Sequence, residues 1–241
     1  MEVIVKWAMS TADQITSIGP ERRSSIDSME LAAIEPTPLF SYLKETRVGL
    51  DHLECYALHE FCKNSFVILS PLDITISVDP ETSFLTVHEF TDTAYKSLCY
   101  NRGKTDRGYS MTMPPPIVFY SSQDVVMESM GLSIVKHPKN TSVFPGRFNI
   151  SKWVRPIDWT FELINGVTEI AVKRGDPLFV VRFFPASGGK VRLERVEYDE
   201  TLHKIVSACT GFKALNKKTP LAKLYAMGDE YIKRFLKKMN A

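Results

Sequence analysis

The sequence has no long apolar run and few cysteines. Nowhere do about 18 consecutive apolar residues occur, so we expect no transmembrane helix. Charged Glu2 and Lys6 interrupt the short apolar N-terminal stretch, so we expect no signal peptide and a cytoplasmic location. The four cysteines include no Cys-x-x-Cys pair, which disfavours a zinc ribbon and a dithiol redox site. We therefore expect reduced thiols.

The short motifs of several large enzyme classes are also missing. The chain has no Gly-x-Ser-x-Gly, no His-Glu-x-x-His and no Gly-x-Gly-x-x-Gly, which disfavours the corresponding hydrolases, zinc enzymes and dinucleotide-binding enzymes. The basic loop with Arg102, Lys104 and Arg107 lacks the spacing of a phosphate-binding P-loop. We expect that loop to be a solvated connection.

The composition is that of an ordinary globular protein. Hydrophobic residues make up 44% of the 241 residues and charged residues 24%, which excludes a disordered or fibrous chain. A chain of this length buries roughly 70% of its unfolded surface, so it needs no disulfide or metal to fold. We expect an N-terminal strand and extended arm over 1–38, a β-sandwich core over 39–198 and packed C-terminal helices over 199–241.

Alternating apolar residues predict strands in the first half of the chain. Residues 2–7 place every second residue on one apolar face, and Ile74–Val78 does the same. The turn at 79–81 and the segment Phe84–His88 complete a predicted β-hairpin, in which we expect Phe84 to face inward. The polar residues 101–108 and residues 138–146 are predicted loops.

The second half predicts short strands joined by tight turns. Asn165-Gly166 is the strongest turn signal, because both residues accept the left-handed backbone conformation. Strands are predicted at 117–120 and within 125–135, where one or two fit. Four more follow at intervals of about 10 residues, at 160–164, 168–173, 178–184 and 190–198. This spacing favours a mainly β (α+β) fold, an antiparallel β-sandwich of jelly-roll or cupin-like type.

Three segments have the apolar spacing of amphipathic helices. Glu54–Lys63 is one, and Asp199 is a suitable N-cap for a second helix that reaches Ala208 or beyond. Thr219-Pro220 begins a third, whose apolar stripe extends to Met239. The last two helices form the predicted C-terminal pair.

Two stretches of the chain resemble a known group of sequences. They are Cys55–Asp79, which includes KNSFVILSPLDITISVD, and Ile150–Glu197, which includes WVRPIDWTFELINGVTEIAVKRGDPLFVVRFFP. Together they are similar to an uncharacterised domain-of-unknown-function family of phage-encoded and bacterial hypothetical proteins, frequent in T4-like marine phages. The resemblance covers roughly half of the chain. It implies a phage-like origin and a β-rich fold, and it implies no reaction.

One candidate site is a non-haem iron centre. A cupin-like sandwich often holds Fe(II) on two histidines and one carboxylate. His52 and Glu54 have the His-x-acid spacing that would place both on one strand face, with His137, or alternatively His88 or His203, as the distal ligand. Because Glu54 adjoins a predicted helix, a chance triplet explains the same residues.

A second candidate is the segment KWVRPIDWTF. Arg155 stacked on Trp153 or Trp159, with Asp158 nearby, would form a ligand-binding platform. An Arg155–Asp158 pair that fixes a turn between two core tryptophans explains the same residues, and we favour this structural interpretation.

The C-terminal segment has the clearest charge pattern. Residues 213–241 contain eight basic residues and two acidic ones, a net +6, which leaves −4 for residues 1–212 out of the total of +2. The basic side chains that we expect to contact a partner, or to be solvated if the helix only packs, are Lys233, Arg234, Lys237 and Lys238. An acidic surface, an anionic membrane or nucleic acid could each be the partner of such a helix. The small total charge makes general or specific nucleic-acid binding unexpected, although a local basic contact fits it.

The sequence therefore favours a non-enzymatic interaction or assembly protein of phage-like origin. Such a protein would be associated with a virion or would bind a host factor, in the host cytoplasm. A cupin-like non-haem Fe(II) oxygenase is the alternative, and without it no cofactor is expected.

Overall fold

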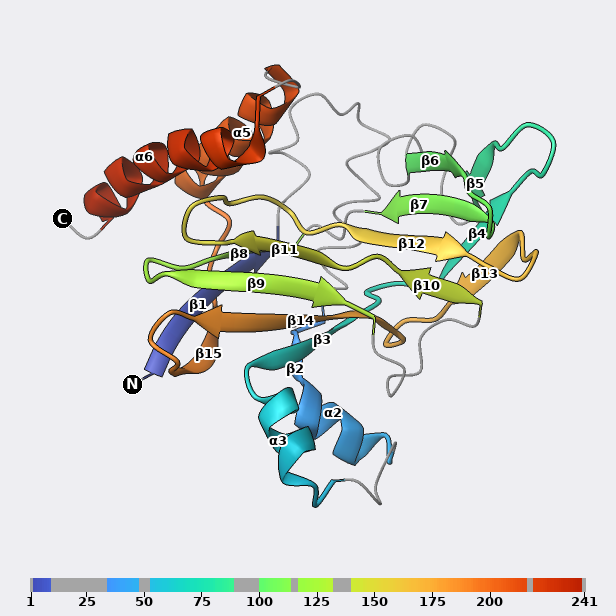
Figure 1. The fold of residues 1–241 in the computed structure, drawn as a ribbon, viewed down its shortest axis with the longest axis horizontal. Helices are drawn as coiled ribbons and strands as arrows, with labels where there is room; N and C mark the ends of the chain where they lie inside the picture. Colours follow the sequence, from blue (N-terminus) through green and yellow to red (C-terminus); the bar gives the residue numbers. More distant parts are fainter. Residues whose placement is uncertain are drawn as a thin grey trace.

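The computed structural model describes residues 2–9, 34–47, 53–88, 100–113, 117–131, 140–215 and 219–239. Within these ranges, more residues lie in strands than in helices, which confirms the mainly β, sandwich-like class (Figure 1). The strands are β1 Glu2–Met9, β2 Thr37–Pro38, β3 Ser65–Leu69, β4 Ile74–Val78, β5 Leu85–Val87, β6 Tyr100–Lys104, β7 Tyr109–Met113, β8 Ile117–Tyr120, β9 Val125–Met130, β10 Thr141–Val143, β11 Gly146–Asn149, β12 Trp159–Leu163, β13 Glu169–Val172, β14 Pro177–Pro185 and β15 Lys190–Arg195. The helices are α2 Leu39–Glu45, α3 Tyr56–Cys62, α5 Glu200–Leu215 and α6 Leu221–Met239.

The described strands form four sheets. Their strand orders are β15-β1-β8, β10-β12-β7-β6, β11-β9-β14-β3-β2 and β13-β4-β5. In Figure 1, α5 and α6 lie on one side of the strands, whereas α2 and α3 lie on the opposite side, next to β3. All the pairings are antiparallel except that of β1 with β15.

Strand β1 confirms the predicted N-terminal strand. Val3, Val5 and Trp7 are fully buried, as the alternation predicts. The strand pairs antiparallel with β8 and parallel with β15. A parallel pair needs a long connection, and here almost the whole chain supplies it. Residues 10–33 of the predicted arm lie outside the described residues.

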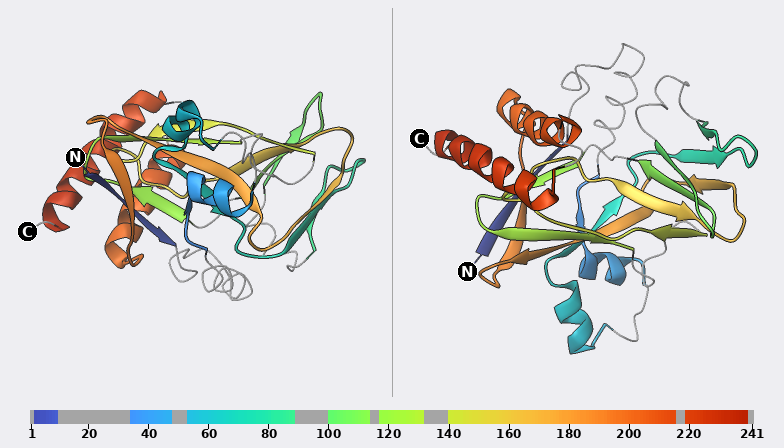
Figure 2. Two further views of the ribbon diagram at one scale, coloured as in Figure 1. Left: turned by 90° about the horizontal axis from the view of Figure 1, so that it is seen from below. Right: turned by 45° about the horizontal axis from the view of Figure 1, so that its top comes forward.

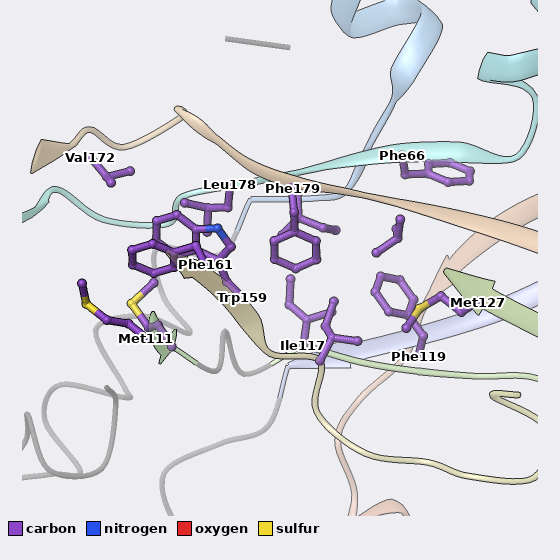
Figure 3. Close-up of a cluster of buried hydrophobic side chains, with 14 of the residues drawn as sticks. Phe66, Met111, Ile117, Phe119, Met127, Trp159, Phe161, Val172, Leu178 and Phe179 are labelled. Carbon is purple, nitrogen blue, oxygen red and sulfur yellow. The ribbon is translucent and has the colours of Figure 1, made fainter. Parts of the chain in front are cut away.

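A main hydrophobic core fills the space between the sheets (Figure 3). Trp159 and Phe161 stack on each other with centroids 4.0 Å apart, and Figure 3 shows Met111 beside them. At the other end of this core, Phe119 packs edge-on against Phe183 at 5.3 Å. Large aromatic side chains therefore hold the sheets together.

The β4–β5 hairpin is present, but its second strand has the opposite register from the one expected. Phe84 is 49% exposed, and Leu85 and Val87 face the core instead. The turn causes this shift: Ser83 adopts a left-handed conformation (φ 56°) and the turn closes with the Asp79 N–H donating to the Phe84 carbonyl. One extra turn residue moves every following side chain to the other face.

Two predicted loops are wrong because they contain strands. Most of residues 101–108 belongs to the β6–β7 hairpin, and residues 138–146 contain β10. Both β6 and β10 are edge strands of the same sheet. Edge strands tolerate polar residues and irregularities, such as the register shift near Gly103, which has a φ of 114°.

The predicted helices are confirmed, with different lengths. Helix α3 is Tyr56–Cys62, and α5 begins after Asp199, whose carboxylate accepts the Leu202 N–H at 2.7 Å. Helix α5 continues to Leu215, and α6 follows Pro220. Helix α2 was not predicted from the sequence, and it packs with α3 over β3 in a small separate core.

The C-terminal helices enclose a second core. It joins α5 and α6 to β8 and to the connection before β12 (Figure 2). Its buried members are Ala8, Val118, Tyr120, Trp153, Val154, Tyr198, Leu202, Ile205, Val206, Cys209, Leu224 and Ile232. In the described residues, no helix has the length and hydrophobicity needed to cross a membrane.

Candidate interaction surfaces

The residues of the predicted iron site are described only in part. Glu54 lies exposed in the turn that precedes α3, and not on a strand. His52 and His137 lie outside the described residues, so this ligand set stays a prediction. Within the described ranges, no group of three or more His, Cys, Asp or Glu side chains is placed to hold a metal ion.

The alternative distal histidines lie in other networks. His203 is on α5, where Nε2 is 3.3 Å from the Ser207 hydroxyl. His88 follows β5, with its Nε2 2.8 Å from the Ser77 hydroxyl and 3.9 Å from a Glu169 carboxylate oxygen. A catalytic triad needs the acid on the other ring nitrogen, Nδ1. The serine and the acid here approach the same nitrogen, so the three residues form a surface network across the β13-β4-β5 sheet.

The structure separates the predicted tryptophan platform into two parts. Trp153 lies in the second core, edge-on to Tyr225 of α6 with centroids 5.6 Å apart, whereas Trp159 lies in the main core. Arg155 donates to Asp158 at 2.7 Å, and its guanidinium stacks on Phe148 at 5.6 Å instead of on a tryptophan. The ion pair therefore ties the turn between the two cores.

Helix α6 packs very closely against the same turn. A Cβ atom on Gly228 would lie 2.8 Å from the Lys152 carbonyl oxygen and 3.0 Å from the Trp153 ring. Cys209 of α5 is fully buried nearby, and burial raises the pKa of its thiol. The thiol therefore stays protonated at neutral pH and is a packing group.

The outward side of α6 is basic. Lys223, Lys233 and Arg234 are exposed there, and Lys233 contacts Asp229 at 2.6 Å while remaining 71% exposed. The side chains of Lys237 and Lys238 lie outside the described part of the chain. The inward side of α6 is apolar and buried, as the sequence spacing predicts.

A buried carboxylate that sequence analysis missed lies on β12. The Glu162 side chain is only 2% exposed, and one of its carboxylate oxygens accepts a hydrogen bond from the Thr105 hydroxyl. Its other carboxylate oxygen is 2.5 Å from Arg107 of the β6–β7 loop. The alternation of β12 gives the face on which Glu162 lies, but it cannot show that the face is covered.

A cation–aromatic stack on the five-stranded sheet was also missed. The Arg147 and Arg182 guanidiniums lie 5.2 and 4.9 Å from the Phe184 ring, and Arg182 lies 5.1 Å from Phe61. These residues come from β11, β14 and α3. No local sequence signal could have found them, because only strand pairing brings them together.

The fold and these surfaces define a mainly β protein with charged side chains displayed on a helix and on a sheet. A scan against models of known protein families found no match, and neither did a search of curated proteins.

Proposed function

We propose that this chain is an interaction or assembly protein that binds an acidic protein surface through the exposed basic face of α6. The observation that carries the proposal is the two-sided character of this helix. Leu224 and Ile232 are buried in the second core, while Lys223, Lys233 and Arg234 remain exposed. The docked helix therefore displays its charged side.

The packing of α6 favours a protein partner over a membrane. An amphipathic helix that lies in a bilayer must bury its own apolar side chains among the lipids. Among the described side chains of α6, Leu224 and Ile232 are already buried and Tyr225 packs against Trp153. Gly228 abuts the turn at Lys152. The exposed side of α6 displays Lys223, Lys233 and Arg234 beside Glu230, and Lys233 also pairs with Asp229. The cations outnumber the acids there, and such a surface suits carboxylates.

The charge distribution also supports an acidic partner. Residues 213–241 carry +6 and residues 1–212 carry −4. A local cationic surface accelerates association with an acidic one, even when the total charge is small. The small total charge of +2 does not favour nucleic acid. The family resemblance favours a virion protein or a host factor as this partner.

The test uses a labelled polyglutamate peptide as the acidic probe and fluorescence anisotropy as the readout. We expect the full chain to bind it, and expect binding to weaken between about 50 mM and about 300 mM salt. The double variant Lys233→Glu/Arg234→Glu should bind at least about tenfold more weakly. The matched control, Lys44→Glu/Lys190→Glu, makes the same change in charge at exposed sites away from α6.

Two results would overturn the proposal. One is an equal loss in the control variant, which would show that only total charge matters. The other is tighter binding of anionic vesicles or of a single-stranded oligonucleotide, lost in the α6 variant, which would assign the helix to a different class of partner.

A further inference from the structure

A row of alternating charges crosses the outer face of the five-stranded sheet. Arg147 on β11 lies directly opposite Glu128 on β9, and Glu128 lies directly opposite Arg182 on β14. The neighbours Met127 and Phe183 point into the main core, so the charged row points away from it. Across three adjacent strands, the order of charges is positive, negative, positive.

The two arginines are held in place by an aromatic ring and not by Glu128. Their guanidiniums stack on Phe184 at 5.2 and 4.9 Å. Among the ion pairs of the described residues, none within 4.0 Å joins Glu128 to either arginine. A stacked guanidinium keeps donor edges for a carboxylate in its plane, so Arg147 and Glu128 retain capacity for an outside partner.

We infer that this face is the contact between two copies of this chain. A twofold axis between β11 and β9 would place Arg147 against Glu128 of the second copy, and Glu128 against Arg147 of the second copy. Such a contact is isologous, because one patch is its own complement. Half-buried Val126 and Phe184, in the next row of the same face, add apolar surface beside the two ion pairs.

The position of the helices fixes which end of the sheet is used. Helices α2 and α3 cover the β2–β3 end, where Val67 and Val180 are buried beneath them. Among the described residues, the part of this face that no helix covers is therefore β11, β9 and the adjoining side of β14. A net charge of +2 imposes little repulsion between two copies. The inference rests on the proposed assembly function, but it uses a different face from α6.

Sedimentation equilibrium of the full chain and its charge-reversal variants tests the inference. The unmodified chain should dimerise, and Arg147→Glu and Glu128→Arg should each raise the dimer dissociation constant by at least about tenfold. Each single variant then carries two like charges at the contact. An equimolar mixture of the two variants should regain the dimer, because both contacts become pairs of opposite charge, and the double variant R147E/E128R should regain it as well.

Recovery of the dimer on mixing would show that Arg147 and Glu128 act at the contact and do not merely stabilise the fold. Two misfolded variants would not regain the dimer when they are mixed. A monomer at about 100 µM chain, or single variants that stay monomeric when mixed, would overturn the inference. The variant Lys233→Glu/Arg234→Glu should still dimerise while it loses the polyglutamate probe. A monomeric chain that still binds the probe through α6 would refute the dimer and leave the proposed function standing.

Discussion

Glu162 shows how a single residue can depart from what its sequence context predicts. A buried carboxylate is costly unless it is paired and hydrogen-bonded. Here Thr105 and Arg107 supply those partners from the β6–β7 loop, so the loop and β12 stabilise each other. Arg107 itself is 62% exposed, although the group that it neutralises is buried.

Removing Arg107 should therefore cost more than its exposure indicates. We expect Arg107→Ala to lower the free energy of unfolding by about 1–3 kcal/mol, because it leaves the Glu162 carboxylate buried with only the Thr105 hydroxyl. Urea denaturation measures the change. In the double variant R107A/E162Q no buried charge remains unpaired, so most of the loss should be recovered. Equal losses in the single and double variants would contradict this account.

At the scale of elements, the docking of α6 depends on one close contact between the helix and a turn. The helix reaches the turn before β12 at Gly228, where even a Cβ atom would collide with the Lys152 carbonyl oxygen. Glycine in a helix interior is otherwise unfavourable by about 1 kcal/mol relative to alanine. Close packing against Trp153 is the physical reason that glycine is suitable at this position.

The two glycines of the C-terminal helices should respond in opposite directions to alanine. Gly228→Ala should destabilise the chain by about 1–3 kcal/mol, since the helix must move away from the turn. Gly211→Ala in α5 meets no atom within 4 Å and should stabilise by up to about 1 kcal/mol. Thermal unfolding of both variants checks the pair. A stabilised Gly228→Ala chain would show that α6 is not docked at this turn.

At the scale of the whole molecule, the described residues form two larger cores, and the second one contains two buried tyrosines. Burial, with smaller effects from Asp199 and Glu194, raises the pKa of Tyr120 to about 12. Burial also raises the pKa of Tyr198. An unfolded tyrosine ionises near pH 10, so in the folded chain both hydroxyls stay neutral to higher pH.

Because the folded pKa is the higher one, we expect the free energy of unfolding to fall at alkaline pH. A folded pKa above the unfolded one means that the stability is fully present below pH 10 and is lost as the pH rises from about 10 to about 12. Tyr120 alone accounts for a loss on the order of 2–3 kcal/mol by pH 12. Urea denaturation at pH 8, 10 and 11 should show the decline, and Tyr120→Phe should make it shallower. If the stability of Tyr120→Phe fell with pH as steeply as that of the unmodified chain, ionisation of Tyr120 would not be the cause.

Much of the architecture follows from local sequence patterns, and each part that does not has a physical reason. The alternation in Ile74–Val78 and the left-handed Asn165-Gly166 turn are local properties, and the structure has both. The prediction that Phe84 faces inward was wrong, because one extra residue in the turn reversed which side chains of β5 face the core. Strands β6 and β10 were missed because polar edge strands have the composition of loops.

Some features of the candidate surfaces could likewise be predicted from the sequence and others could not. The basic face of α6 could be predicted, because helical spacing alone separates its lysines from its apolar stripe. The burial of Glu162 and the row Arg147, Glu128 and Arg182 could not, because their partners come from other strands. The sequence by itself determined the strands, the turns and the charge asymmetry, since these depend on neighbours along the chain. Only the tertiary structure decided which polar side chains are covered and which meet across a sheet, because strand pairing and docking place distant residues together.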